Sequence, residues 1–148
     1  MMKSKVLFDN FSGEKTYALV LETGDEVVSS LLRFATENEL TASHFTAIGA
    51  LSEVTLGYFN LNKKDYKNIP IKEQVEVLSL VGNVAMDKGK PRVHAHIVVG
   101  KSDGTAHGGH LVEAYVRPTL EVIIDESPEY LRRRFDPEIG LALIDLDA

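Results

Sequence analysis

Short stretches of apolar residues, bounded by turn-forming residues, recur along most of the chain and predict β-strands. Several of them carry apolar residues on both faces, which is typical of a sheet that is covered on both sides. Gly49 marks a break between two of the strands, and Pro118 interrupts another, which we expect to form one or two strands. The predicted strands are residues 16–22, 42–51, 52–60, 73–87, 92–100, 111–125 and 141–147, with a weaker strand or loop at 64–70.

The predicted strand at residues 73–87 alternates incompletely. Residues at every second position share one face of a strand, which here places together Val75, Val77, Ser79 and Val81. Leucines at positions 78 and 80 break this alternation, so both faces of the strand look covered. The glycine at position 82 predicts a bulge or a bend.

Two segments have the pattern of helices. From Asp25 to Leu40 the apolar residues have helical spacing, and acidic residues at positions 25 and 26 suit the first turn. The stripe consists of Val27, Val28, Leu31, Leu32 and Ala35. Ser127 can cap a second, short helix with Pro128 at its first position. The fold class is therefore α+β: a mainly antiparallel or mixed sheet flanked by helices, with its remaining apolar face covered by another subunit.

Length and composition predict one cytoplasmic domain spanning residues 1–148. The chain has 148 residues, 44% of them hydrophobic, and shows no repeat or linker. No apolar run reaches the roughly 18 residues that span a bilayer, and the N-terminus lacks the plan of a signal peptide. Without cysteine, any metal must be held by His, Asp, Glu or water. The net charge of −6 argues against direct binding of nucleic acid, and Arg132–Arg134 is interpreted as a solvated helix end.

Four of the chain's five histidines lie between Arg92 and Leu111. His94 and His96 are two positions apart on a predicted strand, so their side chains share one face, with Cα atoms about 7 Å apart. At that spacing both imidazoles can bind one ion through metal–nitrogen bonds of about 2.0–2.1 Å. The opposite face is apolar, as a face toward the core should be, with Val93, Ala95 and Ile97.

The length of the following turn decides which histidine completes the cluster. With a three-residue loop, Ser102–Gly104, His96 faces His110 on the same side of the sheet, and His107 points to the other side. With a two-residue loop His110 points away, and a bulge at residues 108–109 alters either register. We favour the three-residue loop, because the glycine at its third position suits the left-handed conformation found there. The predicted metal ligands are therefore His94, His96 and His110.

Three neutral imidazoles with an open fourth position form the ligand set of a catalytic-type zinc site, completed by water or substrate. Nickel, iron and copper accept the same ligands. The alternative is a polar pocket lined by histidines without metal. Glu113 and Glu121 are nearby acids, and Glu113 is the candidate for a catalytic base. The alternative for each is a solvated or structural carboxylate. His44, which stands alone among apolar residues, is interpreted as structural.

Three motifs, "LVGN" at residues 80–83, "HAH" at 94–96 and "GGHL" at 108–111, occur in an order and spacing that resemble the plants-and-prokaryotes-conserved (PPC) domain. The resemblance runs from about Thr16 to Leu146 and also includes "YALVLETGDEV" and "FTAIGALSEVTLGYFN". It implies a compact domain with a mainly antiparallel sheet flanked by helices, assembled as a homotrimer. It also implies that the histidines matching His94, His96 and His110 bind zinc in some members.

The resemblance leaves three hypotheses for function. The first is a stand-alone, trimeric, metal-binding module that acts on a small ligand or a protein partner. The second is a metal-dependent hydrolase or lyase acting on an unknown small substrate, with Glu113 as the base. The third is a DNA-associated regulator, since plant members follow an AT-hook and prokaryotic members are provisionally described as DNA-binding. This chain has no Arg-Gly-Arg tripeptide and is acidic, so we do not expect it to bind DNA directly.

Overall fold

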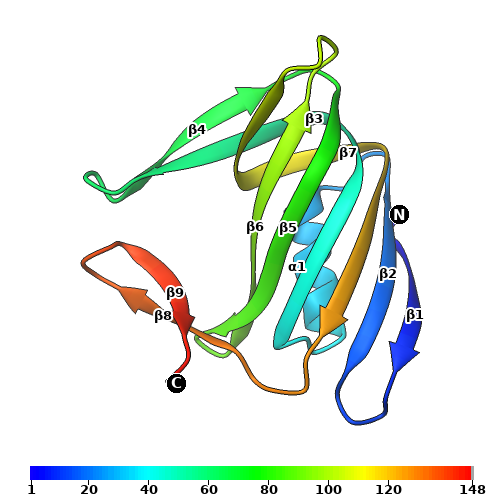
Figure 1. Cartoon of the computed structure of the whole chain (residues 1–148), viewed down its shortest axis with the longest axis vertical. Coiled ribbons are helices and arrows are strands. Elements are labelled where there is room, and N and C mark those ends of the chain that lie inside the picture. Colours follow the sequence, from blue (N-terminus) through cyan, green and yellow to red (C-terminus); the bar gives the residue numbers. More distant parts are fainter. Residues whose placement is uncertain (148) are drawn as a thin grey trace.

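The computed structural model describes residues 1–147 and shows a nine-stranded mixed sheet with one α-helix, α1 (Val27–Glu37) (Figure 1). Every strand pair is antiparallel except the pair of β5 with β8. The strands are β1 (Lys3–Asp9), β2 (Lys15–Glu22), β3 (Ala42–Asn60), β4 (Asp65–Ile71), β5 (Val75–Asp87), β6 (Lys90–Gly100), β7 (Ala106–Glu126), β8 (Arg132–Asp136) and β9 (Leu141–Asp145).

Four of these strands close on one another. β3 pairs with β5, β5 with β6, β6 with the first part of β7, and β7 with β3. The sheet extends from the second half of β7 through β2 and β1, and from the second half of β3 through β4. β8 joins β5 through one bridge, between Met86 and Arg132, and pairs otherwise with β9. The β8–β9 hairpin therefore projects from the body of the domain, on the same side as the β3–β4 hairpin (Figure 1).

The core lies between the inner face of the sheet and α1. The helix contributes Val27, Leu31, Phe34 and Ala35 to it. The largest fully buried side chains of the strands include Phe45, Leu80, Leu120 and Ile124. The opposite face of β3, β5, β6 and β7 is covered by β4 and the β8–β9 hairpin near the histidines, and elsewhere it has no cover within residues 1–147. Its apolar side chains are 40–60% exposed and form what we term the outer apolar face: Ile48, Leu78, Val81, Val98 and Ile123.

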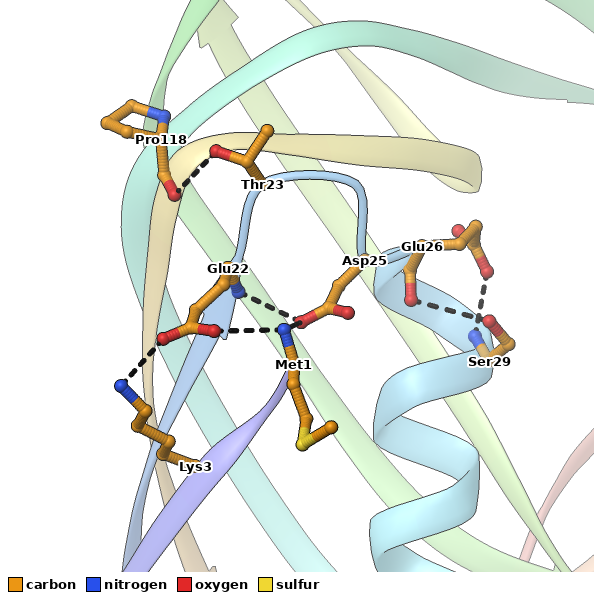
Figure 2. Close-up of polar contacts among 8 residues, drawn as sticks. All are labelled: Met1, Lys3, Glu22, Thr23, Asp25, Glu26, Ser29 and Pro118. Carbon is orange, nitrogen blue, oxygen red and sulfur yellow. Dashed lines mark hydrogen bonds and ion pairs between the residues drawn. The ribbon is translucent and has the colours of Figure 1, made fainter.

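The side chain of Glu26 fixes the first turn of α1. Glu26 is the N-cap, and its carboxylate accepts hydrogen bonds from the backbone N–H groups of Val28 and Ser29. Its Oε2 also accepts from the N–H of Ala114 on β7, which ties the helix to the sheet. Figure 2 shows the neighbouring contacts, in which the Glu22 carboxylate pairs with the Met1 amino group at 2.9 Å and with Lys3 at 2.8 Å. The helix thus begins after positions 25 and 26, which the sequence placed in its first turn.

The prediction of a short helix after Ser127 is wrong, because residues 127–131 form an irregular connection and the residues after them join the sheet. The N–H of Ser127 donates to the carbonyl of Ala42, and that of Met86 donates to the carbonyl of Leu131. Residues 132–136 then form β8 against β9. The cap residue and proline are favourable for a helix only locally, and pairing with distant strands outweighs that preference. Arg132–Arg134 is consequently part of a strand rather than a helix end.

Three strand predictions also need correction. Residues 42–60 form one strand, β3, which has register shifts near Gly49 rather than a break. β7 likewise runs without interruption through Pro118. The bulge in β5 lies at Leu78 instead of Gly82, so the face that begins with Val75 and Val77 does not continue to position 81. At Gly82 the ladder is regular, and the missing Cβ makes room for the ring of Phe45.

Two further strands complete the sheet. The segment at residues 64–70, for which the sequence predicts a weak strand or a loop, forms β4, and its tyrosine at position 66 packs against His110. β1 was not predicted, because it is an edge strand with nearly all of its residues exposed. Among residues 1–147, no helix is long and apolar enough to cross a membrane.

Candidate metal centre

The three predicted histidines meet on the outer side of the β6–β7 hairpin. Each offers one ring nitrogen, and these nitrogens all lie within 4.8 Å of one another. The ring centroids are 5.1 Å apart for His94 and His96, 5.2 Å for His94 and His110, and 5.9 Å for His96 and His110. Nitrogens bound to one tetrahedral ion lie about 3.3 Å apart, given metal–nitrogen bonds of about 2.0–2.1 Å. Side-chain rotation can close this difference, so the donor set fits a metal.

The turn between β6 and β7 produces this arrangement. The N–H of Lys101 donates to the carbonyl of Thr105 at 2.9 Å, and the N–H of Gly104 donates to the carbonyl of Lys101 at 2.9 Å. Gly104 has φ +83°, as the three-residue loop requires. His96 consequently lies opposite His110, while His107 lies opposite Val99 on the other face. The register prediction is confirmed, and no bulge occurs at residues 108–109.

Tyr66 holds the ring of His110 from the β4 side. The two ring centroids are 4.7 Å apart, with an interplanar angle of 30°. This contact depends on Gly57 of β3, because a Cβ there would lie 3.0 Å from Tyr66 and 3.4 Å from His110. The Nδ1 atom of His110 is buried and has no hydrogen-bond partner within residues 1–147. A bound metal would supply the missing partner for such a nitrogen.

Arg133 of β8 lies near His94, and both line one hollow. Its guanidinium donates to Asn83 Oδ1 at 2.6 Å and to the carbonyl of Ala142 at 2.9 Å. Asn83 pairs directly with His94 in the β5–β6 ladder. Arg133 lines a hollow of about 130 Å³ together with His94 and His110, and the other walls come from β4, β6 and β9.

The surroundings favour neutral imidazoles. Burial lowers the pKa of His94 to about 4, and the positive charge of Arg133 adds to this effect. Burial also lowers the pKa of His110. Neutral imidazole is the form that binds a metal, because the ligating nitrogen must offer its lone pair. The cluster is therefore ready to accept a divalent cation near pH 7.

The other residues singled out in the sequence lie elsewhere. Glu113 is exposed, accepts a hydrogen bond from the Tyr115 hydroxyl at 2.9 Å, and lines a separate hollow with Lys72. The structure therefore does not bring Glu113 to the histidines. Glu121 is exposed on the second half of β7. His44 lies on the outer side of β3, where its Nε2 is 3.4 Å from an Asp125 carboxylate oxygen.

Sequence reasoning missed Tyr66, Asn83 and Arg133. Tyr66 occurs in a segment without clear alternation, and Arg133 in a run of arginines interpreted as solvated. Both come from strands that the local pattern did not define, and long-range pairing places them beside the histidines. Asn83 belongs to the motif at residues 80–83. Its position opposite His94 follows only from the pairing of β5 with β6.

Comparisons with known proteins place this chain in a family. The model of the Plants and Prokaryotes Conserved (PCC) domain, also abbreviated PPC, matches residues 8–128. A bifunctional protein GlmU from Synechococcus sp. (strain JA-3-3Ab) is 33% identical to this chain over 129 residues. The match covers 85% of this chain and only 20% of the length of GlmU.

Solved structures agree over nearly the whole chain. A Bacteroides thetaiotaomicron protein, provisionally described as DNA-binding, has a TM-score of 0.89 and 28% identity, with 98% of this chain and 99% of that chain covered. A PPC protein from Pyrococcus horikoshii has a TM-score of 0.83 and 33% identity, with 97% and 94% covered. A metal-containing protein from Archaeoglobus fulgidus has a TM-score of 0.82 and 35% identity, with 97% of each chain covered. This chain belongs to the Plants and Prokaryotes Conserved domain family.

Proposed function

We propose that this protein is a metal-binding module in which His94, His96 and His110 hold one divalent cation, with zinc as the expected metal. The observation that carries the proposal is the convergence of three ring nitrogens within 4.8 Å. The unpartnered buried nitrogen of His110 supports it, as does the similarity to a metal-containing protein from Archaeoglobus fulgidus. Three protein ligands leave one position for water or a small ligand.

A binding or regulatory role fits this site better than hydrolysis or elimination. Within residues 1–147 the hollow beside the histidines is lined by no carboxylate, and Glu113 faces a different hollow. A general base must lie within hydrogen-bonding reach of the proton that it removes, directly or through one water. The metal-dependent hydrolase or lyase therefore remains the second candidate, and it would need a base other than Glu113.

We further propose that the protein is a homotrimer that buries the outer apolar face. This face carries five side chains that are 40–60% exposed, more than scattered surface residues would explain. Val81 pairs directly with His96, so the face continues into the metal centre. Association through it would place the histidines at or near a subunit boundary.

We expect no direct binding to DNA. The net charge of −6 opposes contact with phosphates, although two of the similar solved proteins are provisionally described as DNA-binding. A role in DNA regulation would then act through a partner protein. The cytoplasmic location expected from the sequence remains a prediction.

The metal content of untagged protein tests the first proposal. Plasma mass spectrometry should find close to one zinc ion per subunit in the parent after incubation with zinc. The double variant His94→Ala, His96→Ala should lose it. His107→Ala is the matched control, because His107 belongs to the same hairpin and points to the other face. A parent without metal, or a double variant that keeps it, would overturn the proposal.

A further inference from the structure

The β3–β4 and β8–β9 hairpins enclose a crevice that leads to the histidines. Their tips touch, because Lys64 Nζ donates to the carbonyl of Pro137 at 2.9 Å. Gly140 allows this approach, since a Cβ there would lie 3.0 Å from the Cβ of Lys64. The two hairpins lie on the same side of the domain in Figure 1. This single contact between the hairpin tips therefore bounds the crevice at one end.

Two adjoining hollows make up this crevice. The outer one, of about 330 Å³, lies beneath the hairpin tips, and the inner one, of about 130 Å³, ends at His94 and His110. Both hollows are lined by Tyr66, Arg92, Leu141 and Ala142. Their shared lining residues show that the two hollows adjoin, and the inner one reaches the histidines. Together they are of a size suited to a small molecule.

Positive charge increases toward the inner end. The outer hollow mixes Lys64 and Lys88 with two aspartates, one of which, Asp87, pairs with Arg92 at 2.8 Å. The inner hollow contains Arg92 and Arg133 and, within the described chain, no acidic residue. On a protein of net charge −6 this is a local site for an anion.

The hydrogen bonds of the Arg133 guanidinium suit it to bind an anion. Two of its terminal N–H groups are occupied by Asn83 and Ala142, which fixes the plane of the guanidinium. Its Nε is buried and lacks an acceptor anywhere in residues 1–147. A buried donor without an acceptor costs free energy, and a carboxylate oxygen in the inner hollow would satisfy it once the guanidinium turns this N–H toward the ligand. Arg92 has further N–H donors beyond the one that contacts Asp87.

Apolar side chains form part of the walls. Leu141 and Ala142 of β9 and Tyr66 of β4 line both hollows, and Phe59 and Phe135 line the outer one. An inorganic anion would leave these surfaces in contact with water. We propose that the crevice binds a small organic carboxylate, with its charged group between Arg92 and Arg133 and its apolar body along Tyr66 and Leu141.

This inference deepens the proposed function, since His94 and His110, which would hold the metal, line the same inner hollow as Arg92 and Arg133. It rests on that function only in part, because Arg92 and Arg133 line the inner hollow without any metal being present. A test can therefore examine the anion site with and without zinc, and so separate failure of one proposal from failure of the other.

The test uses benzoate as the probe, benzamide as its neutral counterpart, and inorganic phosphate. ¹⁵N-labelled full-length protein is titrated in metal-free and zinc-loaded forms, and zinc is quantified in the same samples. We expect benzoate to shift the amide resonances of Tyr66, Arg92 and Ala142 in both forms, and benzamide to leave them in place. Arg133→Met and, separately, Arg92→Gln should weaken benzoate binding by about tenfold or more. Arg134→Gln is the control, because Arg134 lies on the same strand outside the crevice and pairs with Asp145 at 2.6 Å.

Each alternative outcome has a distinct meaning. Zinc at full occupancy without any benzoate-induced shift overturns the carboxylate site and leaves the metal proposal standing. Benzoate binding by a protein that takes up no zinc after incubation with zinc overturns the metal proposal and leaves the carboxylate site standing. Binding that requires zinc and ignores both arginine substitutions would mean that the metal alone holds the anion. Tighter binding of phosphate than of benzoate would reject the organic carboxylate in favour of a phosphate site.

Discussion

His96 on β6 lies directly opposite His110 on β7, so a single cross-strand pair supplies two of the three imidazoles. The side chain at position 94 joins them from the same strand face, two residues away. A shift of one residue in this pairing would turn one imidazole to the other side of the sheet. The loop Ser102–Gly104 therefore controls the centre without contributing a side chain to it.

Replacing the glycine of this loop should destabilise the fold while leaving the cluster intact. Gly104 has φ +83°, and a Cβ there would meet no atom within 4 Å, so Gly104→Ala carries only the cost of the left-handed backbone. We expect a loss of about 1–2 kcal/mol in the free energy of unfolding, measured by urea denaturation. Ser102→Ala in the same loop should change it by less than about 0.5 kcal/mol. Equal losses in both variants would argue against this account.

The depressed pKa of His94 predicts a pH-dependent contribution to stability in metal-free protein. The pKa is about 4 in the folded chain, below the ordinary histidine value of 6.5 that applies to the unfolded chain. Between these values the unfolded state binds more protons, so this contribution is complete above pH 6.5 and is lost as the pH falls toward 4. His94→Gln lacks this proton-binding group. Its stability relative to the parent should therefore rise as the pH is lowered from 7.5 to 5, and a constant difference across that range would contradict the prediction.

The carboxylate of Glu126 should be a main support of the junction between α1 and β3. It is 9% exposed and accepts from the N–H groups of Thr41 and Ala42 and from the Ser43 hydroxyl. Glu126→Ala leaves these donors without an acceptor and should cost about 3 kcal/mol in unfolding free energy.

A milder substitution and a control accompany that measurement. Glu126→Gln keeps one acceptor oxygen and should lose about half as much. Glu121→Ala, at an exposed position of the same strand, should stay within about 0.5 kcal/mol of the parent. A loss at Glu121 as large as that at Glu126 would show that burial of the carboxylate is not the cause.

Charge on the outer apolar face should dissociate the proposed trimer. Ile123→Glu and Val81→Glu each introduce a carboxylate that association would bury without a partner. Sedimentation should shift from about three subunits to one at micromolar concentration, with an unchanged circular dichroism spectrum. Leu61→Glu is the control, since Leu61 is 65% exposed in the turn between β3 and β4. A parent that sediments as a monomer would remove this proposal altogether.

The three histidines were predictable because they depend on local rules. The alternation of side chains and the length of one loop sufficed to bring His94, His96 and His110 together. Arg133 and Tyr66 were not predictable, because their positions follow from pairings between residues far apart in the chain. The false helix after Ser127 has the same origin: a favourable local cap was outweighed by hydrogen bonds to β3 and β5. Glu113, chosen for nearness in sequence, lies three residues from His110 and faces another hollow.

All three imidazoles come from one hairpin, β6 and the beginning of β7, and this has a kinetic consequence. Bringing the two strands together closes only the short loop that joins them, and hairpins of this kind form in about 1–10 μs. The ring nitrogens can therefore gather before β3 and β7 have completed their long-range ladder. The proposed metal would then also bind a chain that still lacks its core, and ions held by the unfolded chain would reduce the net stabilisation of the native state.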